Sequence, residues 1–323
     1  MPKKKKCIVA FDTSNYTTSI AVCDLEGRVL ANLKAPLPVK DGERGLRQSD
    51  AVFAHTKNLP TLCDNLAEAI EELEPVAVGV SSTPRCADGS YMPCFLCGVA
   101  AAHSFAAQNK LKVYETSHQN GHIMAAAYSS GAFDKLMSSR FLAFHVSGGT
   151  TEALLITPQD NGVGFDVELV GETADINAGQ AIDRVGVMLG IPFPCGKELE
   201  LLASQYKGSI AKRQVCVRDG ICSLSGVENI AQKMCGEGAD KAEIAAFVFD
   251  FICRTLVKMT QQILTKYGDM PVLYAGGVMS NMLMREELSK HSEAYFSMPE
   301  FSSDNAAGVA LITQRKLAAE ETI

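Results

Sequence analysis

The sequence predicts an α/β protein of two lobes, and three observations point to this fold class. A strand-rich stretch at residues 7–33 recurs in plan at residues 140–170, which indicates a duplicated unit. Between and after the two copies, segments with helical periodicity alternate with short apolar runs. The chain has 323 residues, 47% of them hydrophobic, and is long enough for two domains. We expect one lobe over residues 1–138 and the other over residues 139–323.

The first lobe is expected to begin with a meander of three strands. Two apolar runs flank a turn rich in Ser, Thr and Asn, and a third run follows the turn at Glu26 and Gly27. The apolar spacing of residues 55–73 and 95–110 predicts two helices. Strands are predicted between and after these helices, at residues 75–82 and 111–116.

The second copy replaces the first turn by "SGGTT", residues 147–151, and has a second turn at Asn161 and Gly162. In an ungapped superposition Ser14 corresponds to Ser147, and the two threonines after each turn coincide as well. Helices are predicted at residues 178–190 and 241–268, a strand at 271–277, and a closing helix from residue 304 onwards. The recurrence favours duplication of one α/β plan.

Composition restricts the class of protein only loosely. A net charge of −7 neither indicates nor excludes a nucleic-acid partner. Eleven scattered cysteines are typical of reduced thiols in a cytoplasmic protein, and the CxxC of Cys94 and Cys97 fits small buried side chains better than a redox or zinc pair. The apolar run after "MPKKKK" is too short for a signal peptide or a membrane span, so no membrane association is expected.

"SHQNGH" sets His118 and His122 four residues apart, which places both side chains on one face of a helix. Two imidazoles so placed can converge on a metal ion. Alternatively, His118 caps the helix and His122 packs at its surface, and this alternative stands unless a third ligand is found.

The "HVSGGTTE" segment presents several backbone N–H groups in a short turn, which suits phosphate binding but also fits a plain hairpin. In "VLYAGGVMSN" an apolar strand ends at Gly276 and Gly277 just before a helix, so the backbone there can approach a ligand closely. The two glycine pairs together favour a nucleotide site.

Six motifs occur in the order found in one family. They are "FDTSNYTTSIAV", "HQNGH", "HVSGGTTE", "GETADINAGQAIDRVGVMLGIPFPCG", "LYAGGVMSN" and "FSSDNAAGVA". The chain thereby resembles the tRNA threonylcarbamoyladenosine transferases, formerly labelled O-sialoglycoprotein endopeptidases. The resemblance implies the actin/Hsp70/sugar-kinase superfold, with duplicated ribonuclease-H-like domains.

The resemblance also implies an activity. It is the transfer of a threonylcarbamoyl group from threonylcarbamoyl-AMP to the exocyclic amine of the adenosine next to a tRNA anticodon, with AMP as leaving group. The implied cofactors are a divalent metal, iron or zinc, and an adenine nucleotide, which is threonylcarbamoyl-AMP, ATP or AMP. The implied partners are tRNA, a smaller paralogous subunit and an ATPase subunit.

The family's site residues carry over by position. The metal ligands fall on His118, His122 and Asp304, which supplies the missing third ligand. The nucleotide and acyl-adenylate contacts fall on His145, Val146, Ser147, Gly148, Gly149, Asp183, Gly196 and Asn281. Asp183 suits the ribose hydroxyls, although without the resemblance it fits a surface helix charge beside Arg184. No catalytic residue is assigned; Asp12 is a candidate.

Several positions depart from the family pattern. The departures are Asn15 and Tyr16 after Thr-Ser, Asn120 in the histidine motif, Ile176, Asn177 and Gln180 in the middle motif, and Cys195 before Gly196. Most of them replace acidic residues, which raises the question of whether the acceptor is the same.

Other functions therefore stay open. One is a divergent paralogue that binds a metal and an adenine nucleotide but uses another acceptor. Another is a small-molecule kinase of the same superfold, with Asp12 as its base. A non-catalytic partner subunit fits less well, because the family's smaller partner lacks the metal histidines. Peptidase activity also fits poorly, because Gln119 stands where His-Glu-x-x-His needs its Glu.

Overall fold

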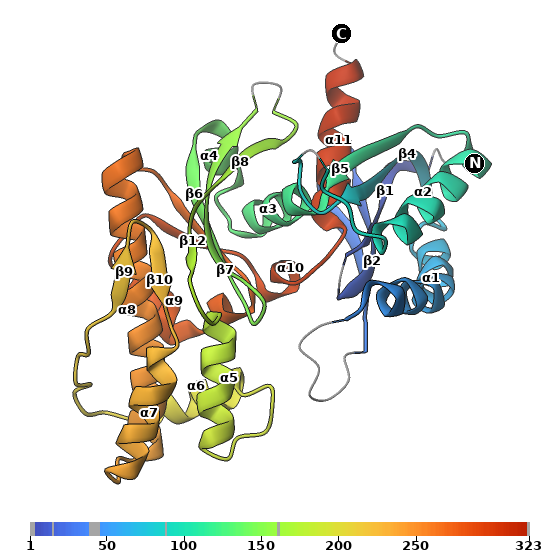
Figure 1. Cartoon of the computed structure of the whole chain (residues 1–323). Coiled ribbons are helices and arrows are strands. Elements are labelled where there is room, and N and C mark those ends of the chain that lie inside the picture. Colours follow the sequence, from blue (N-terminus) through green and yellow to red (C-terminus); the bar gives the residue numbers. More distant parts are fainter. Residues whose placement is uncertain (1–3, 15, 39–45, 88, 160–161, 322–323) are drawn as a thin grey trace. The chain divides into compact units, whose positions relative to one another are not determined.

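The computed structural model describes residues 4–14, 16–38, 46–87, 89–159 and 162–321 (Figure 1). The chain forms two compact units. The first comprises Met1–Tyr128, Pro158–Phe165 and Glu300–Ile323, and the second Ser129–Thr157 and Asp166–Pro299. Asn15 and Asn161, which the sequence placed in turns, lie outside the described residues.

The first unit contains a five-stranded sheet in the order β3-β2-β1-β4-β5. Its elements are β1 (Lys5–Thr13), β2 (Thr17–Asp24), β3 (Val29–Pro36), α1 (Gln48–Ala69), β4 (Leu73–Thr83), α2 (Phe95–Asn109), β5 (Val113–Ser117), α3 (His118–Ser129) and α11 (Ala307–Glu321). Strands β1, β2 and β3 pair antiparallel, whereas β4 and β5 extend the sheet in parallel. This confirms the predicted meander.

Helices cover both faces of this sheet, so its central strands read as continuous apolar runs. Cys7, Val9 and Phe11 of β1 pack with α1 and α2. The alternate residues Ile8 and Ala10 point to the other face and are equally buried. Helix α11 contacts β1, β2 and β4.

The second unit contains a seven-stranded sheet in the order β12-β11-β6-β7-β8-β10-β9. Its strands are β6 (Phe141–Val146), β7 (Thr151–Pro158), β8 (Phe165–Thr173), β9 (Cys216–Arg218), β10 (Ile221–Ser223), β11 (Val272–Ala275) and β12 (Ala294–Phe296). Its helices are α4 (Phe133–Ser138), α5 (Ala178–Met188), α6 (Gly196–Gln205), α7 (Gly226–Gly236), α8 (Lys241–Tyr267), the 3-10 helix η1 (Gly277–Ser280), α9 (Met282–Leu288) and α10 (Pro299–Ser302).

The two sheets share one plan. Read from one edge, β3-β2-β1-β4-β5 corresponds strand by strand to β8-β7-β6-β11-β12. Strand β1 pairs antiparallel with β2 and parallel with β4, and strand β6 pairs antiparallel with β7 and parallel with β11. The duplication inferred from the two strand-rich stretches is thus present in the topology, and the α/β class is confirmed.

The division of the chain differs from a single boundary near residue 138. Residues 300–323, assigned from the sequence to the second lobe, belong to the first unit. The physical reason is the apolar face of α11: Val309, Leu311 and Ile312 are buried, and the helix packs on the first sheet. The closing helix also begins at Ala307, so Asp304 lies in the loop before it.

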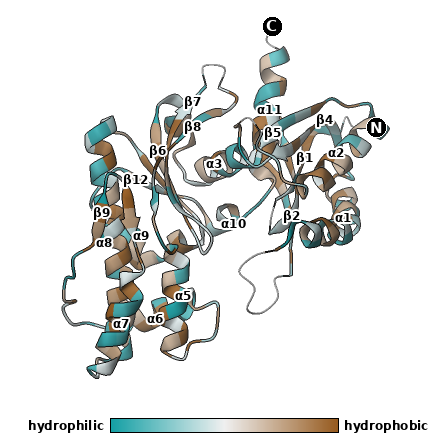
Figure 2. Ribbon diagram, viewed as in Figure 1, coloured by the Kyte–Doolittle hydropathy of each residue, from teal (hydrophilic) through white to brown (hydrophobic). Residues whose placement is uncertain are grey.

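The second unit has the larger core. This core is built around helix α8, whose sixteen buried residues lie on more than one face of the helix. Helix α7 lies against α8 and carries both hydrophilic and hydrophobic residues along its length (Figure 2). None of the helices formed by the described residues combines the length and the hydropathy needed to cross a bilayer.

Candidate metal and nucleotide sites

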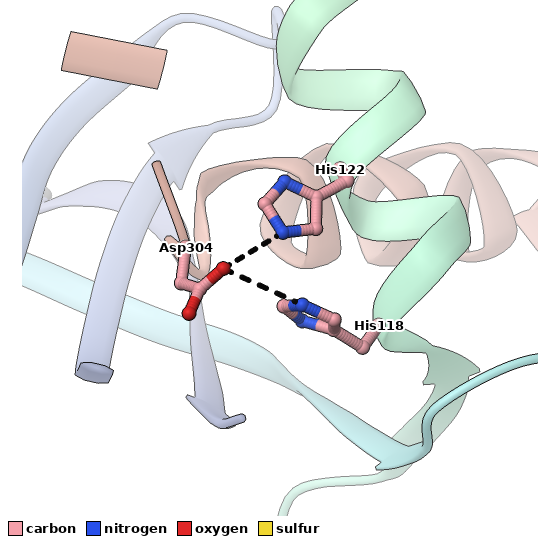
Figure 3. A group of neighbouring side chains, drawn as sticks. All are labelled: His118, His122 and Asp304. Atoms are coloured by element: carbon pink, nitrogen blue, oxygen red, sulfur yellow. Dashed lines mark hydrogen bonds and ion pairs between the residues drawn. The ribbon is translucent and has the colours of Figure 1, made fainter. Parts of the chain in front are cut away.

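His118 and His122 begin helix α3 and lie one turn apart, as their spacing predicts. Figure 3 shows both rings directed at the carboxylate of Asp304. Asp304 Oδ1 lies 2.9 Å from His122 Nε2 and 3.7 Å from His118 Nε2. All three side chains are about four-fifths buried. The third ligand expected from the family resemblance is therefore beside the histidine pair.

A close helix contact brings Asp304 to this place. Gly308, at the start of α11, lies against the backbone of α3: a Cβ atom added to Gly308 would overlap the carbonyl oxygen of Gly121 and come within 2.9 Å of Ala125 N. Any larger residue at position 308 would push the two helices apart. The loop that carries Asp304 immediately precedes α11, so this contact sets the distance between the carboxylate and the histidines.

Asp12 supports the group from the end of strand β1. Its Oδ2 lies 2.7 Å from His118 Nδ1, and its Oδ1 accepts the backbone N–H of Ser14 at 2.9 Å. Burial opposes the charged forms of both side chains, but their mutual attraction is stronger. As a result the pKa of Asp12 lies below its ordinary value, and the pKa of His118 is raised to about 9 by the charge and hydrogen bond of Asp12 and the charge of Asp304.

The donor set suits a transition metal. The two ring nitrogens and the carboxylate oxygen lie within 4.8 Å of one another, which makes His118, His122 and Asp304 a candidate metal group among the described residues. Imidazole with carboxylate is a donor set that zinc and non-haem iron use in catalytic sites with open positions. The residues present therefore fit such an ion.

Asn120, which departs from the family pattern, does not join this group in the structure. Its Nδ2 contacts Cys86 Sγ at 3.4 Å, its backbone N–H donates to Ser117 Oγ, and its Oδ1 is buried without a partner among the described residues. Tyr16 is 42% exposed. Of the CxxC pair, Cys94 is fully buried and Cys97 is partly buried against Val52 O.

In the second unit, the "SGGT" turn joins β6 to β7. Ser147 Oγ accepts the backbone N–H groups of Gly149 and Thr150, and Ser147 N–H donates to Thr150 O at 2.7 Å. A Cβ atom at Gly148 or Gly149 would meet nothing within 4 Å. The turn is therefore internally fixed and its glycine backbone faces open space, as a phosphate-binding turn requires.

The N-terminus of helix α5 is fastened to the same turn. Gly179 N–H donates to Ser147 O, and a Cβ atom at Gly179 would come within 2.7 Å of Gly148 Cα, so only glycine permits this approach. Gln180 Oε1 accepts the N–H of Asn177, which closes a capping box at the start of the helix. Asn177 and Gln180, which depart from the family pattern, therefore cap the N-terminus of helix α5.

Asp183 and Gly196 lie at the next helix junction. Asp183, on α5, accepts the backbone N–H of Cys195 at 2.9 Å, while Gly196 opens α6 with free space around it. Burial raises the pKa of Asp183, and the hydrogen bond from Cys195 opposes the shift. The thiol of Cys195 lies 3.4 Å from Asp183 O and packs beside Gly186, where an added Cβ atom would overlap Cys195 Cβ and lie 2.6 Å from Sγ. Cys195 is thereby accommodated without displacing Gly196.

Asn281 is the N-cap of helix α9 and directly follows the 3-10 helix η1. Its Oδ1 accepts the N–H of Met284 at 2.8 Å, which is an N-cap. Its Nδ2 is buried and has no hydrogen-bond partner among the described residues. A buried amide donor without a partner is unfavourable, so it is a natural contact for a ligand.

His145 and Val146 complete this group at the end of β6. His145 pairs in register with Ala275 of β11 and Glu152 of β7. Gly276 has φ 100° and packs against the backbone of Val146, which draws the ends of β6 and β11 together. The expected nucleotide residues therefore lie in one unit: His145 to Gly149 at the C-terminal end of β6 and in the turn after it, Asp183 within α5, and Gly196 and Asn281 at the N-termini of α6 and α9. The C-terminal ends of parallel strands are where ligands of α/β sheets usually bind.

The fold places the chain in a known structural class. HypF from T. kodakarensis is similar with a TM-score of 0.62 at 13% identity, covering 98% of this chain and 48% of that one. A ROK family glucokinase from Streptomyces griseus is similar with a TM-score of 0.53 at 14% identity, covering 95% and 99%. At these identities the likeness concerns the fold alone, and it confirms the expected actin/sugar-kinase superfold.

Sequence comparison defines the family within this class. The family model of tRNA N6-adenosine threonylcarbamoyltransferase matches residues 39–311, and the chain belongs to this family. A tRNA N6-adenosine threonylcarbamoyltransferase of Streptococcus gordonii is 29% identical over 98% of this chain and 99% of its own length. One from Latilactobacillus sakei is 30% identical over 91% and 84%. The resemblance inferred from the six motifs is confirmed, and the chain is a transferase that acts on tRNA.

Proposed function

We propose that this protein transfers a threonylcarbamoyl group from threonylcarbamoyl-AMP to the exocyclic amine of the adenosine next to the anticodon of tRNA. Family membership supports the transfer to tRNA. The observation that carries the choice of an adenylate as donor is the "SGGT" turn, whose open glycine backbone is held on the N-terminus of α5.

The nucleotide part of the donor would be held by three kinds of contact. The backbone N–H of Gly148 binds the phosphate, and the N–H of Gly149 joins it by exchanging Ser147 Oγ for a phosphate oxygen when the donor binds, since consecutive amides in a tight turn form an anion site. Asp183 accepts hydrogen bonds from the ribose hydroxyls, as carboxylates do in other nucleotide sites. Asn281 Nδ2 donates to the base or the acyl group, which would give this buried donor its partner.

His118, His122 and Asp304 would hold the metal, which we propose to be iron or zinc because of the mixed nitrogen and oxygen donors. When bound, the ion would supply Lewis acidity and would orient oxygen ligands. The chain's own contribution is the orientation of the three ligands by helix α3 and by the loop before α11.

The acceptor sets the chemical demand. An adenine amine is a poor nucleophile, so the protein must hold it at attack distance from the carbonyl and stabilise the charge that develops on the acyl oxygen and the departing phosphate. Fixed backbone amides suit this task because they need no reorganisation during the reaction. The adenosine lies in a single-stranded loop, where a base can be splayed outwards.

Asp12 is not proposed as a catalytic base, and the kinase alternative loses its candidate residue. Both carboxylate oxygens of Asp12 are engaged, one with His118 Nδ1 and the other with Ser14 N–H. Its side chain is 1% exposed. A base must reach the proton that it removes, and a carboxylate occupied and buried in this way does not.

We further propose that the protein works in the cytoplasm with a smaller paralogous subunit and an ATPase subunit, as the family resemblance implies. The test of the whole proposal uses purified full-length protein, threonylcarbamoyl-AMP and unmodified tRNA, with and without candidate partner subunits. Mass spectrometry of the digested tRNA should detect threonylcarbamoyladenosine. Bound adenine nucleotide with no modified nucleoside under any combination would instead support a paralogue with another acceptor.

A further inference from the structure

We propose that Asp12 is a positioning residue for the metal: it holds His118 so that Nε2, and not Nδ1, is presented to the ion. The inference rests on the metal group proposed above. It replaces the role that the sequence left open for Asp12, that of a catalytic base.

The two oxygens of Asp12 receive two different donors. Oδ2 lies 2.7 Å from His118 Nδ1, and Oδ1 accepts Ser14 N–H at 2.9 Å. Asp12 lies at the C-terminal end of the buried strand β1, and the Ser14 contact fixes the plane of its carboxylate. The acceptor offered to His118 is therefore rigid, because neither the backbone nor the carboxylate is free to turn.

Fixing Nδ1 as the donor determines what the rest of the ring does. A neutral imidazole that carries its proton on Nδ1 has its lone pair on Nε2. His118 Nε2 is the atom directed at Asp304, 3.7 Å from Oδ1. A metal held by Nε2 would complete the carboxylate–histidine–metal arrangement that orients ligands in many metal sites and raises the basicity of the ligating nitrogen.

A second contact restrains the same ring. Phe95, at the start of α2, meets the His118 ring edge-on with 5.9 Å between ring centroids. Phe95 is itself buried. Packing limits where the ring can move, but an apolar contact does not distinguish Nδ1 from Nε2. The choice of ligating nitrogen must therefore come from Asp12.

Substitution by asparagine tests this directly. Asp12→Asn keeps the size of the side chain but leaves one oxygen for two donors, so either Ser14 or His118 loses its acceptor. Asp12→Glu keeps both carboxylate oxygens, so it should bind the metal more tightly than Asp12→Asn does. The matched control is Asp24→Asn, because Asp24 is another fully buried carboxylate of the same sheet, bound to Lys5 and Arg28 and not to a histidine.

The measurement is a titration of the metal-stripped full-length protein with Co²⁺, followed by visible absorption. We expect Asp12→Asn to weaken Co²⁺ binding about 10- to 100-fold and to change the absorption bands, whereas Asp24→Asn leaves both unchanged. In ¹⁵N spectra of the zinc-loaded protein, His118 should carry its proton on Nδ1 in the wild type and give an altered signal in Asp12→Asn.

Failure of this inference is distinguishable from failure of the metal site. If His118→Ala and Asp304→Ala abolish Co²⁺ binding while Asp12→Asn retains wild-type affinity and spectrum, Asp12 does not position the ligand. If all three variants bind Co²⁺ like the wild type, the proposed metal group itself is wrong, and the inference about Asp12 is overturned with it.

Discussion

Gly308 of α11 and Gly121 of α3 meet through their backbones, with no room for a side chain at Gly308. This contact joins the helix that carries the two histidines to the segment that carries Asp304. Both glycines belong to motifs quoted for the family resemblance, yet neither is a ligand. Their place in the site is explained by the approach of the two helices.

We expect Gly308→Ala to lower stability by about 1–3 kcal/mol, because its methyl group overlaps the carbonyl oxygen of Gly121. Metal affinity should fall at the same time, since the loop with Asp304 moves away with α11. Urea denaturation and Co²⁺ titration measure the two effects. Gly226→Ala is the control, because it also lies in the first turn of a helix and its methyl group would meet open space. If Gly308→Ala and Gly226→Ala have the same stability and the same Co²⁺ affinity, the contact between α3 and α11 does not have this role.

The contact between Gly186 and Cys195 should show strong coupling. Gly186→Ala places a methyl group 2.6 Å from Cys195 Sγ, so it should destabilise the second unit and weaken binding of AMP. In the double variant with Cys195→Gly the thiol is gone, and we expect both properties to recover. The interaction energy from the double-mutant cycle should be about 0.5–3 kcal/mol. Additive effects would show that the two side chains do not share this space.

Asn281 offers a way to separate capping from ligand binding. Asn281→Ser keeps an oxygen that can accept Met284 N–H but removes the buried Nδ2 donor. We expect near wild-type thermal stability with about three- to tenfold weaker AMP binding, the value of one hydrogen bond. Asn281→Ala removes both the acceptor and the donor, so it should lower thermal stability and also weaken AMP binding. Unchanged nucleotide affinity in the serine variant would exclude Asn281 Nδ2 as a contact.

Asp175 should make stability depend on pH. Its carboxylate accepts the N–H groups of Ile176, Leu224 and Ser225 and the hydroxyls of Ser223 and Ser225. Partial desolvation opposes ionisation, but these hydrogen bonds hold the pKa of Asp175 well below its ordinary value. A depressed folded-state pKa stabilises the protein above the unfolded pKa of about 3.9, and this contribution is lost as the pH falls through the folded value.

Asp175→Asn should therefore cost about 1–2 kcal/mol at pH 7, a value reduced because the side chain is exposed to solvent. The difference from wild type should persist at pH 5 and become smaller at pH 3, as urea denaturation at each pH would measure. Glu237→Gln removes only an exposed ion pair with Lys233 and serves as control. A stability difference between Asp175→Asn and wild type that stays the same from pH 7 to pH 3 would contradict this role of Asp175.

Local patterns predicted much of the fold and the shared helical face of His118 and His122. The duplicated strands, helices α2 and α8 and the position of the "SGGT" turn follow from periodicity and turn residues. The spacing of His118 and His122 left a metal role open, and Asp304 required family resemblance, because 182 residues separate it from His122. No local pattern indicates a contact over that distance.

Contacts that depend on tertiary packing were not predictable. The link between Asp12 and His118 requires β1, β4 and β5 to lie side by side in parallel, so that the end of β1 comes near the start of α3. The return of α11 to the first unit was missed because amphipathic pattern does not say which sheet a helix covers. The short strands β9 and β10 were also missed, since three residues carry too little periodicity.

The most direct test of the proposed function is a single-turnover transfer with carbonyl-labelled [¹³C]threonylcarbamoyl-AMP and unmodified tRNA, using chelator-treated protein before and after metal is restored. With the required partner subunits present, the label should appear on the N6 atom of the adenosine next to the anticodon only after metal is added. The His118→Ala variant should not transfer it. Labelled tRNA formed equally well by the metal-free protein, or no labelled tRNA from the restored protein with any partner, would contradict the account.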